Sequence, residues 1–167
     1  MTKFNRLLAI GAILSCSAAT VGAQQDFSFT TSSGQTVPMS SMRGKVTVLL
    51  FSGVQDPQRR EGLAALESLA KRYQGKDVNV CWVSVNSPGE FTGEQLKSTA
   101  GSATSVTVLR DPNQVAFKRF SGKLSQLPTV VILDRQGNPV GQPRGGFNPN
   151  SDFINDLAST IDGLLKH

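Results

Sequence analysis

The stretch KVTVLLFSGVQDPQRREGLAALESLAKRY, residues 45–73, decides the fold that we expect for this chain. It opens with a β-branched, apolar run at 45–51, which is typical of a central strand covered on both faces. A helix follows at once, and enzymes often place a nucleophile at such a strand-to-helix junction. The residues at this junction are Gln55, Asp56, Pro57 and Gln58. None of these four is a cysteine, serine or histidine, so the junction raises the question of what chemistry it could perform.

The helix after the junction is predicted from its proline, its cap and its apolar spacing. Pro57 suits the first turn of a helix, and Asp56 or Ser52 is the expected capping residue. The apolar side chains that recur at helical spacing and should face the core are Leu63, Leu66, Ala70 and Tyr73. Gly75 should end this helix.

The rest of the chain alternates between predicted strands and helices. Extended segments are expected within 26–45, around turns at Gly34 and Gly44, and then at 77–87, 105–110 and 127–141, the last being a hairpin turning at Gly137. Helices are expected at 90–101, at 111–122 with Asp111 as the cap, and at 151–167 with Ser151 as the cap. Residues 143–150 should form a loop.

Two of these helices should each bury one apolar stripe. The expected inward residues are Val115, Ala116 and Phe120 in the first, and Phe153, Ile154, Leu157, Ile161 and Leu164 in the second. Strands that alternate with helices and end in a hairpin and one helix predict an α/β fold, a three-layer α/β/α sandwich around a central mixed sheet.

Composition and charge exclude several classes of function. The 167 residues are enough for one core, and 38% hydrophobic with 17% charged residues fits a globular domain. The net charge is +5, which falls to +3 without Lys3 and Arg6 of the expected leader. The basic residues are mostly scattered, so a nucleic-acid partner is not expected. The only histidine is His167, and we therefore expect neither a metal site nor a cofactor.

Residues 1–23 are predicted to be a secretory signal. Lys3 and Arg6 give the charged start, an apolar centre follows at 7–14, and cleavage is expected after Ala23. The alternative is a lipoprotein signal, because Ile13-Leu14-Ser15 before Cys16 has the character of a lipobox. Lipidation at Cys16 would then be the only link to a membrane, since the apolar run is too short to span one. Either route predicts a domain at 24–167 in the periplasm or the cell envelope.

Cys81 would be the lone thiol of the mature domain, because Cys16 is either removed or lipidated. A single cysteine cannot form an internal disulfide. Cys81 lies within the predicted core strand VNVCWVSV, and we expect it to be buried and structural. If Cys81 were exposed instead, it could form a disulfide between two copies of the chain.

With this order of elements, the chain resembles the redoxin branch of the thioredoxin superfamily, which includes TlpA/ResA-type thiol-disulfide oxidoreductases and alkyl hydroperoxide reductase/thiol-specific antioxidant proteins. The resemblance is carried by DFSFTTSSGQTVPMSSMRGKVTVLLF at 26–51, by VQDPQRREGLAALESLAKRY at 54–73 and by LPTVVILDRQGNPV at 127–140. It implies a thioredoxin-like sandwich with a cis-proline loop, and hence a cis bond between Leu127 and Pro128.

The resemblance also implies a Cys-x-x-Cys motif at the start of the helix, and here the chain departs from it. Gln55 and Gln58 stand at the two cysteine positions, with Asp56 and Pro57 between them. A helix start lowers the pKa of a thiol and favours the thiolate, but an amide has no ionisable proton and no nucleophile to activate. We therefore expect no catalytic residue at this junction, and Asp56 should act only as a helix cap.

The resemblance further implies a surface that holds extended peptide. In thioredoxin-like proteins the motif loop and the cis-proline loop together form the peptide groove. The matching residues here are Val54 to Gln58 in the first loop and Gln126, Leu127, Pro128 and Thr129 in the second. Backbone groups beside Pro128 could pair with an incoming strand, so the expected partner is a protein or an extended peptide.

Three further features are expected to be structural. Trp82 should pack in the core. Arg59 and Arg60 should form a solvated turn. Gly145 and Gly146 should allow a tight turn, because their loop lacks the setting of a phosphate site.

Three functional hypotheses follow. The first is a non-catalytic, extracytoplasmic domain that binds protein or peptide through the former motif. The second is a working thiol-disulfide oxidoreductase or peroxidase that uses Cys81 or a thiol from a partner. The third is a structural subunit of an envelope complex, anchored through Cys16.

Overall fold

The computed structural model describes residues 27–101, 103–124, 126–146 and 151–166. The strands are β1 (Ser28–Thr31), β2 (Thr36–Pro38), β3 (Val46–Ser52), β4 (Val78–Ser84), β5 (Thr107–Arg110), β6 (Thr129–Leu133) and β7 (Arg144–Gly145). The helices are α1 (Arg59–Arg72), α2 (Gly93–Ala100), α3 (Val115–Ser121) and α4 (Ser151–Leu165), with a short 3-10 helix, η1 (Met39–Met42).

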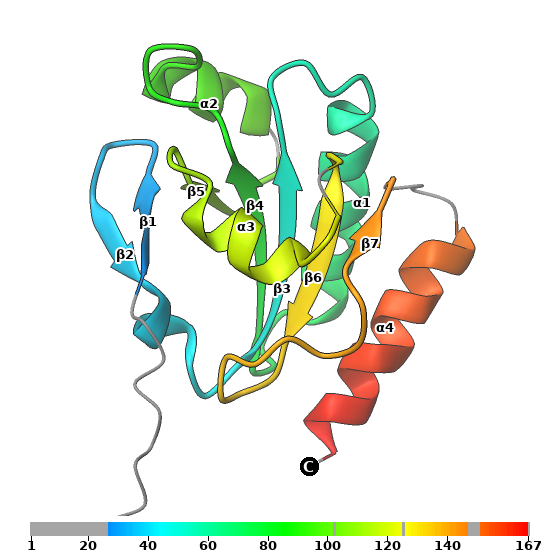
Figure 1. Ribbon diagram of the computed structural model, residues 1–167. Coiled ribbons are helices and arrows are strands. Elements are labelled where there is room, and N and C mark those ends of the chain that lie inside the picture. The colour runs from blue at the N-terminus through cyan, green and yellow to red at the C-terminus, as the bar shows by residue number, and fades with distance from the viewer. Residues whose placement is uncertain (1–26, 102, 125, 147–150, 167) are drawn as a thin grey trace, which may run out of the picture.

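The strands form one mixed sheet in the order β2-β1-β5-β4-β3-β6-β7 (Figure 1). β3 pairs in parallel with β4 and antiparallel with β6, so it lies inside the sheet. All seven residues of β3 are buried, as expected for a strand covered on both faces. The sequence prediction for this strand is confirmed.

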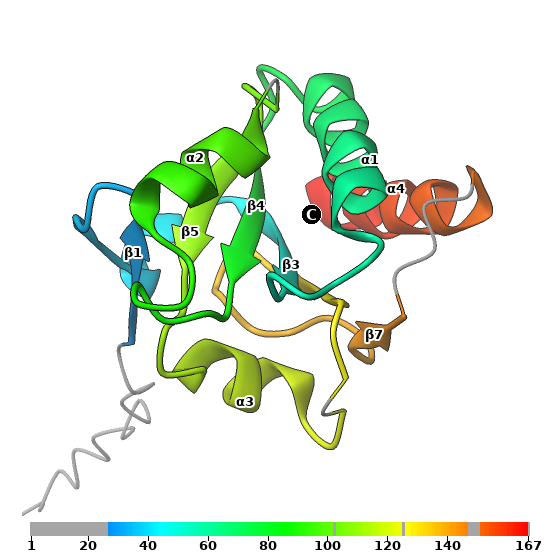
Figure 2. The ribbon, with the colours of Figure 1, turned by 90° about the horizontal axis from the view of Figure 1, so that it is seen from above.

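Helices cover both faces of the sheet. One core cluster joins Val46, Val48 and Leu50 of β3 to side chains of α1, α2 and α4. The other joins Leu49 and Phe51 of the same strand to α3 and η1. Seen from above, α3 lies on one side of the sheet, and α1, α2 and α4 lie on the other (Figure 2). The predicted three-layer sandwich is therefore confirmed.

The apolar stripes of the helices mostly lie where they were predicted. Leu63, Leu66, Ala70 and Tyr73 are all buried. In α4, Leu157 and Ile161 are buried, and Phe153, Ile154 and Leu164 pack partly buried against the same core. The side chain of Ser151, the predicted cap of α4, lies outside the described residues.

Three predictions about these elements are wrong. Helix α1 begins at Arg59, so Pro57 precedes the first helical turn instead of occupying it. Val115 of α3 is 50% exposed, whereas Ala116 and Phe120 are buried as expected. The final strand of the sheet is β7, within the segment predicted as a loop, while the predicted hairpin partner of β6 keeps only a bridge between Leu133 and Pro139.

Side chains cap two of the helices. Thr92 and Gln95 form a reciprocal capping box at the start of α2. At α3, the Asp111 carboxylate accepts the N–H groups of Val115 at 3.0 Å and Phe117 at 2.8 Å. The predicted capping role of Asp111 is thus confirmed.

The expected secretory signal at 1–23, its cleavage after Ala23 and the alternative lipidation of Cys16 all lie outside the described residues and stay predictions. Within the described part of the chain, no helix has the length and apolar character needed to cross a bilayer.

Candidate functional site

The site is built around the turn between β3 and α1, residues 53–58, which we call the motif turn. The Asp56 carboxylate accepts the N–H of Gln58 at 2.9 Å, and the N–H of Asp56 donates to the carbonyl of Gly53 at 3.2 Å. Asp56 therefore orders the turn just before the helix. The N-cap position of α1 is occupied by Gln58 without a side-chain cap bond, so the prediction that Asp56 caps the helix is wrong. The side chains of Gln55 and Gln58 are exposed.

Ser52, the other expected cap, has a different role. Its hydroxyl accepts the indole N–H of Trp82 at 2.7 Å, and both side chains are 1% exposed. The bond satisfies a buried donor between two neighbouring strands. Ser52 is therefore not the cap, and the expected burial of Trp82 in the core is confirmed.

Arg59 closes the motif turn from the helix side. Its guanidinium donates to the carbonyl oxygens of Gly53, at 3.5 Å, and Val54, and it lies 5.8 Å from the centre of the Phe91 ring. Arg59 is half-buried, so the prediction of a solvated arginine pair is wrong for Arg59, although Arg60 is exposed. The two carbonyls on this side of the turn are thus occupied by the chain itself.

The second part of the site is the loop Gln126–Thr129, which we call the proline loop. The peptide bond between Leu127 and Pro128 is cis, as expected. Pro128 and Thr129 are buried, Leu127 is half-buried and Gln126 is exposed. The hydroxyl of Thr129 donates to the Gln126 carbonyl at 2.6 Å, and the Pro128 carbonyl accepts the N–H of Gly146 at 3.0 Å.

The sheet brings the two loops together. Phe51 at the end of β3 pairs with Thr129 at the start of β6, so the segments that follow and precede them meet at the same end of the sheet. A Cβ atom on Gly53 would lie 3.6 Å from the side chain of Leu127. The motif turn and the proline loop therefore form one continuous surface, which we call the paired-loop surface.

A polar network supports the motif turn from the neighbouring strands. The Asn86 side-chain oxygen accepts the N–H of Val54 at 2.7 Å, and the Asn86 carbonyl accepts from the Arg110 guanidinium at 3.0 Å. Arg110 is only 3% exposed, and this burial lowers the pKa of its guanidinium. Sequence reasoning missed Asn86; its signal is a polar residue directly after a buried strand, at the sheet end where the loops meet.

Cys81 lies away from the paired-loop surface, within β4. It is 1% exposed and packs in the core cluster that faces α3. Burial raises the pKa of its thiol to about 12, against which a hydrogen bond with Thr107 acts weakly. The predicted burial of Cys81 is confirmed, and at neutral pH the thiolate, which is the nucleophilic form, is a minute fraction.

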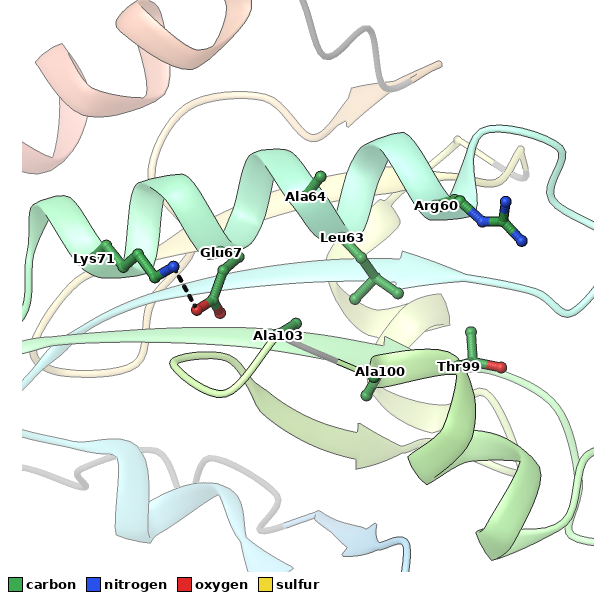
Figure 3. Close-up of a pocket in the computed structure, with 9 residues that line it drawn as sticks. Arg60, Leu63, Ala64, Glu67, Lys71, Thr99, Ala100 and Ala103 are labelled. Carbon is green, nitrogen blue, oxygen red and sulfur yellow. Dashed lines mark ion pairs between the residues drawn. The ribbon is translucent and has the colours of Figure 1, made fainter.

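Three cavities lined by described residues lie away from the paired-loop surface. One, of about 370 Å³, lies between α1 and the end of α2, and Figure 3 shows Glu67 and Lys71 on its α1 wall. The Glu67 carboxylate already accepts from the N–H of Ser105, at 2.9 Å, and from its hydroxyl, at 3.0 Å, and lies 3.4 Å from Lys71. Partial burial would raise the pKa of Glu67, but these contacts together lower it. Its acceptors are therefore used in tying α1 to the chain before β5.

The described residues contain no group of three or more histidine, cysteine, aspartate or glutamate side chains placed to hold a metal ion. The exposed amides of Gln55 and Gln58 on the paired-loop surface can each donate and accept hydrogen bonds.

Several solved structures share this architecture. A candidate thiol:disulfide interchange protein DsbE from Chlorobium tepidum superposes with a TM-score of 0.68 and 24% identity, over 84% of this chain and 93% of that one. The exposed lipoprotein thioredoxin from Streptococcus pneumoniae superposes with a TM-score of 0.65 and 22% identity, over 83% of this chain and 99% of that one. A candidate protein disulfide isomerase from Bacteroides thetaiotaomicron superposes with a TM-score of 0.68 and 23% identity, over 85% of this chain and 87% of that one. At these identities the similarity shows the thioredoxin-like fold.

A comparison with curated proteins gives no match. The sequence profile of the AhpC/TSA family matches residues 21–138, which is more than half of the chain. The chain therefore belongs to the AhpC/TSA family, with a thioredoxin-like fold.

Proposed function

We propose that this chain is a non-catalytic member of its family that binds an extended segment of a protein at the paired-loop surface. One observation carries the proposal. The motif turn and the proline loop are both present and in contact, yet the exposed side chains where family members carry thiols are the amides of Gln55 and Gln58. The scaffold for holding a peptide is kept while the group that would attack a disulfide or peroxide is replaced.

The only cysteine among the described residues supports this reading. Cys81 is buried in the core and its thiol has a pKa of about 12, so it offers neither access nor a thiolate at neutral pH. It also lies in the middle of a strand, whereas the motif turn follows the end of one. Electron transfer at the paired-loop surface would need a thiol from another molecule.

The backbone of the proline loop is the part best suited to hold a peptide. Within the described residues, neither the N–H nor the carbonyl of Leu127 has a hydrogen-bond partner. The carbonyls of Gly53 and Val54 across from it are taken by Arg59. An incoming strand would therefore pair with Leu127, and its side chains would contact the amides of Gln55 and Gln58.

The proposal places this domain outside the cytoplasm, either free after cleavage at Ala23 or anchored through a lipid on Cys16. Mass measurement of the protein from native membranes separates the two routes, because acyl chains add mass to a chain that begins at Cys16.

The rival function is a thiol-disulfide oxidoreductase or peroxidase that uses Cys81 or a partner's thiol. Purified protein should fail to reduce insulin with dithiothreitol and fail to consume peroxide with a thiol donor. An enzyme-like rate that disappears in Cys81→Ala would overturn the proposal.

A gain-of-function variant tests the geometry. In the double variant Gln55→Cys, Gln58→Cys, the two thiols should form a reducible disulfide, detected by mass before and after reduction. The matched control is Gln55→Ser, Gln58→Ser. Failure of the cysteine pair to cross-link in folded protein would show that these positions do not correspond to the family's motif.

A further inference from the structure

We infer that the segment bound at the paired-loop surface is acidic, and that it extends from this surface onto the exposed side of α3. This inference rests on the proposed function and adds the chemistry of the partner. It is carried by the charges and the exposure of α3 and the turn after it.

The exposed side of α3 is basic. Lys118, Arg119 and Lys123 are all exposed, and none of them forms an ion pair with another described residue. From residue 112 to residue 128 the sequence contains no aspartate or glutamate. The nearest acid in sequence is Asp111, which is 3% exposed, lies within the field of Lys118 and has its carboxylate engaged by backbone N–H groups. We call Val115, Lys118, Arg119 and Lys123 the basic face.

The basic face also carries an unusual apolar residue. Val115 is the one large hydrophobic side chain with substantial exposure in the described part of the chain, at 50%. As a single exposed apolar residue, Val115 adds a small apolar contact to the basic face and is not a docking site by itself. The apolar area of one valine is too small to bind a lipid surface, which takes the whole apolar face of an amphipathic helix.

The basic face and the proline loop belong to neighbouring parts of the fold, because Leu127 packs against the core cluster that contains Phe117 and Phe120 of α3. Helix α3 ends at Ser121, and Gln126 of the proline loop follows five positions later in the sequence. A strand paired with Leu127 would therefore run past cations, and acidic side chains on it would be attracted.

The test uses three fluorescein-labelled synthetic peptides of equal length. One alternates glutamate with leucine and serine, and the others carry lysine or glutamine in place of glutamate. In anisotropy titrations with the purified mature chain, the glutamate peptide should bind most tightly, the glutamine peptide less tightly and the lysine peptide most weakly. We expect the glutamate peptide to bind about tenfold more tightly than the glutamine peptide at low salt, from three exposed charge pairs, and to lose this advantage at high salt.

Charge-reversal variants locate the effect. The triple variant Lys118→Glu, Arg119→Glu, Lys123→Glu should lose about tenfold in affinity for the glutamate peptide and little for the glutamine peptide. The matched control, Lys45→Glu, Lys97→Glu, Lys166→Glu, makes the same change of net charge at exposed positions on other parts of the surface. The control should retain the preference for the acidic peptide. Circular dichroism of both variants checks that they fold.

The outcomes separate this inference from the proposed function. A benzophenone side chain at position 55 reports binding at the paired-loop surface through photo-cross-linking. If all three peptides bind equally and cross-link there, the inference of an acidic partner is overturned and the proposed peptide-binding function stands. No binding of any peptide would overturn both. An equal loss of affinity for the glutamate peptide in the control triple variant would show a general effect of net charge. It would overturn the assignment of the acidic segment to the basic face. Binding of vesicles rich in phosphatidylglycerol through the basic face, without peptide binding, would assign this face to a membrane and contradict the inference.

Discussion

The side-chain oxygen of Asn86 accepts the backbone N–H of Val54 at 2.7 Å, which joins the end of β4 to the motif turn. The same residue accepts from the buried guanidinium of Arg110 through its carbonyl. One residue thus links a buried cation at the end of β5 to the loop that we propose as a binding surface. The shape of that loop depends on a neighbouring strand as well as on its own sequence.

Replacing Asn86 should loosen the motif turn. In Asn86→Ala, the N–H of Val54 loses its acceptor, and we expect a loss of about 1–2 kcal/mol in the free energy of unfolding. Hydrogen exchange at the Val54 amide should accelerate well beyond this global loss. Ser87→Ala, in the same loop but with exposed bonds to Glu90, is the control. An unchanged exchange rate at Val54 would mean that Asn86 does not hold the turn.

The thiol of Cys81 should be silent in the folded chain. Its pKa is raised to about 12 and its side chain is buried, so a disulfide reagent at pH 8 should react only as fast as the chain opens. In guanidinium, the same reagent should titrate the Cys81 thiol of a chain that spans residues 24–167 at once. Rapid labelling without denaturant would contradict the burial and would revive the possibility of chemistry at this residue.

Tyr73 should make the fold sensitive to alkali. Its hydroxyl oxygen lies 2.9 Å from the Ala158 carbonyl oxygen and 2.8 Å from the Asp162 carboxylate, and its one proton is shared between these two acceptors. Burial and the Asp162 contact raise the pKa of Tyr73 to about 12 from 10.0. The unfolded chain therefore loses this proton first as pH rises, so the contribution to stability is complete below pH 10 and is lost towards pH 12.

Tyr73→Phe isolates this effect. At neutral pH the free energy of unfolding of the variant should be about 1–2 kcal/mol lower, because the acceptors on α4 lose their donor. Between pH 10 and 12 its stability should fall less steeply than that of the parent chain, with the fall due to Cys81 still present. Urea unfolding at a series of pH values measures both slopes. Parallel slopes would show that the Tyr73 hydroxyl ionises as freely in the folded chain as in the unfolded one.

Gly93 should tolerate no side chain. A Cβ atom at this position would lie 2.1 Å from the backbone carbonyl of Ser32, so α2 and the turn after β1 would have to separate. We expect Gly93→Ala to lower the free energy of unfolding by about 1–3 kcal/mol or more. Gly163→Ala, in α4 with open space around it, should instead stabilise by about 0.5–1 kcal/mol. Thermal melts of the two variants should therefore shift in opposite directions.

Most of the fold could be predicted from the sequence because its signals are local. The apolar run that forms β3, the helical spacing from Leu63 to Tyr73 and the cap at Asp111 each act within a few residues, and each is found where it was expected. The capping box of Thr92 and Gln95 was missed, although Thr-x-x-Gln is itself a readable signal.

The misses depend on tertiary contacts. Val115 is apolar and was expected to face inward, but the buried side of α3 is formed by Ala116, Phe117, Phe120 and Ser121. β7 forms because β6 offers it an unpaired edge, which no local pattern of Arg144 and Gly145 announces. Arg59 was expected in solvent because the turn whose carbonyls it binds is defined only in the folded chain.

The proximity of the two loops could be predicted, whereas their role as a binding site stays a prediction. The resemblance named the two loops, and the register of Phe51 with Thr129 brings them together. The support from Asn86 and Arg110 was missed, because the position of Asn86 in the sequence does not indicate that its partner is Val54, 32 positions earlier in the chain.

The two outermost strands of the sheet have a consequence for self-association. β2 spans three residues and β7 only two, so each border of the sheet presents very little unpaired backbone. Short borders give another copy almost no template on which to add a strand, and fibril growth begins with such addition. Concentrated solutions of the folded domain should therefore resist polymerisation by edge-to-edge strand pairing.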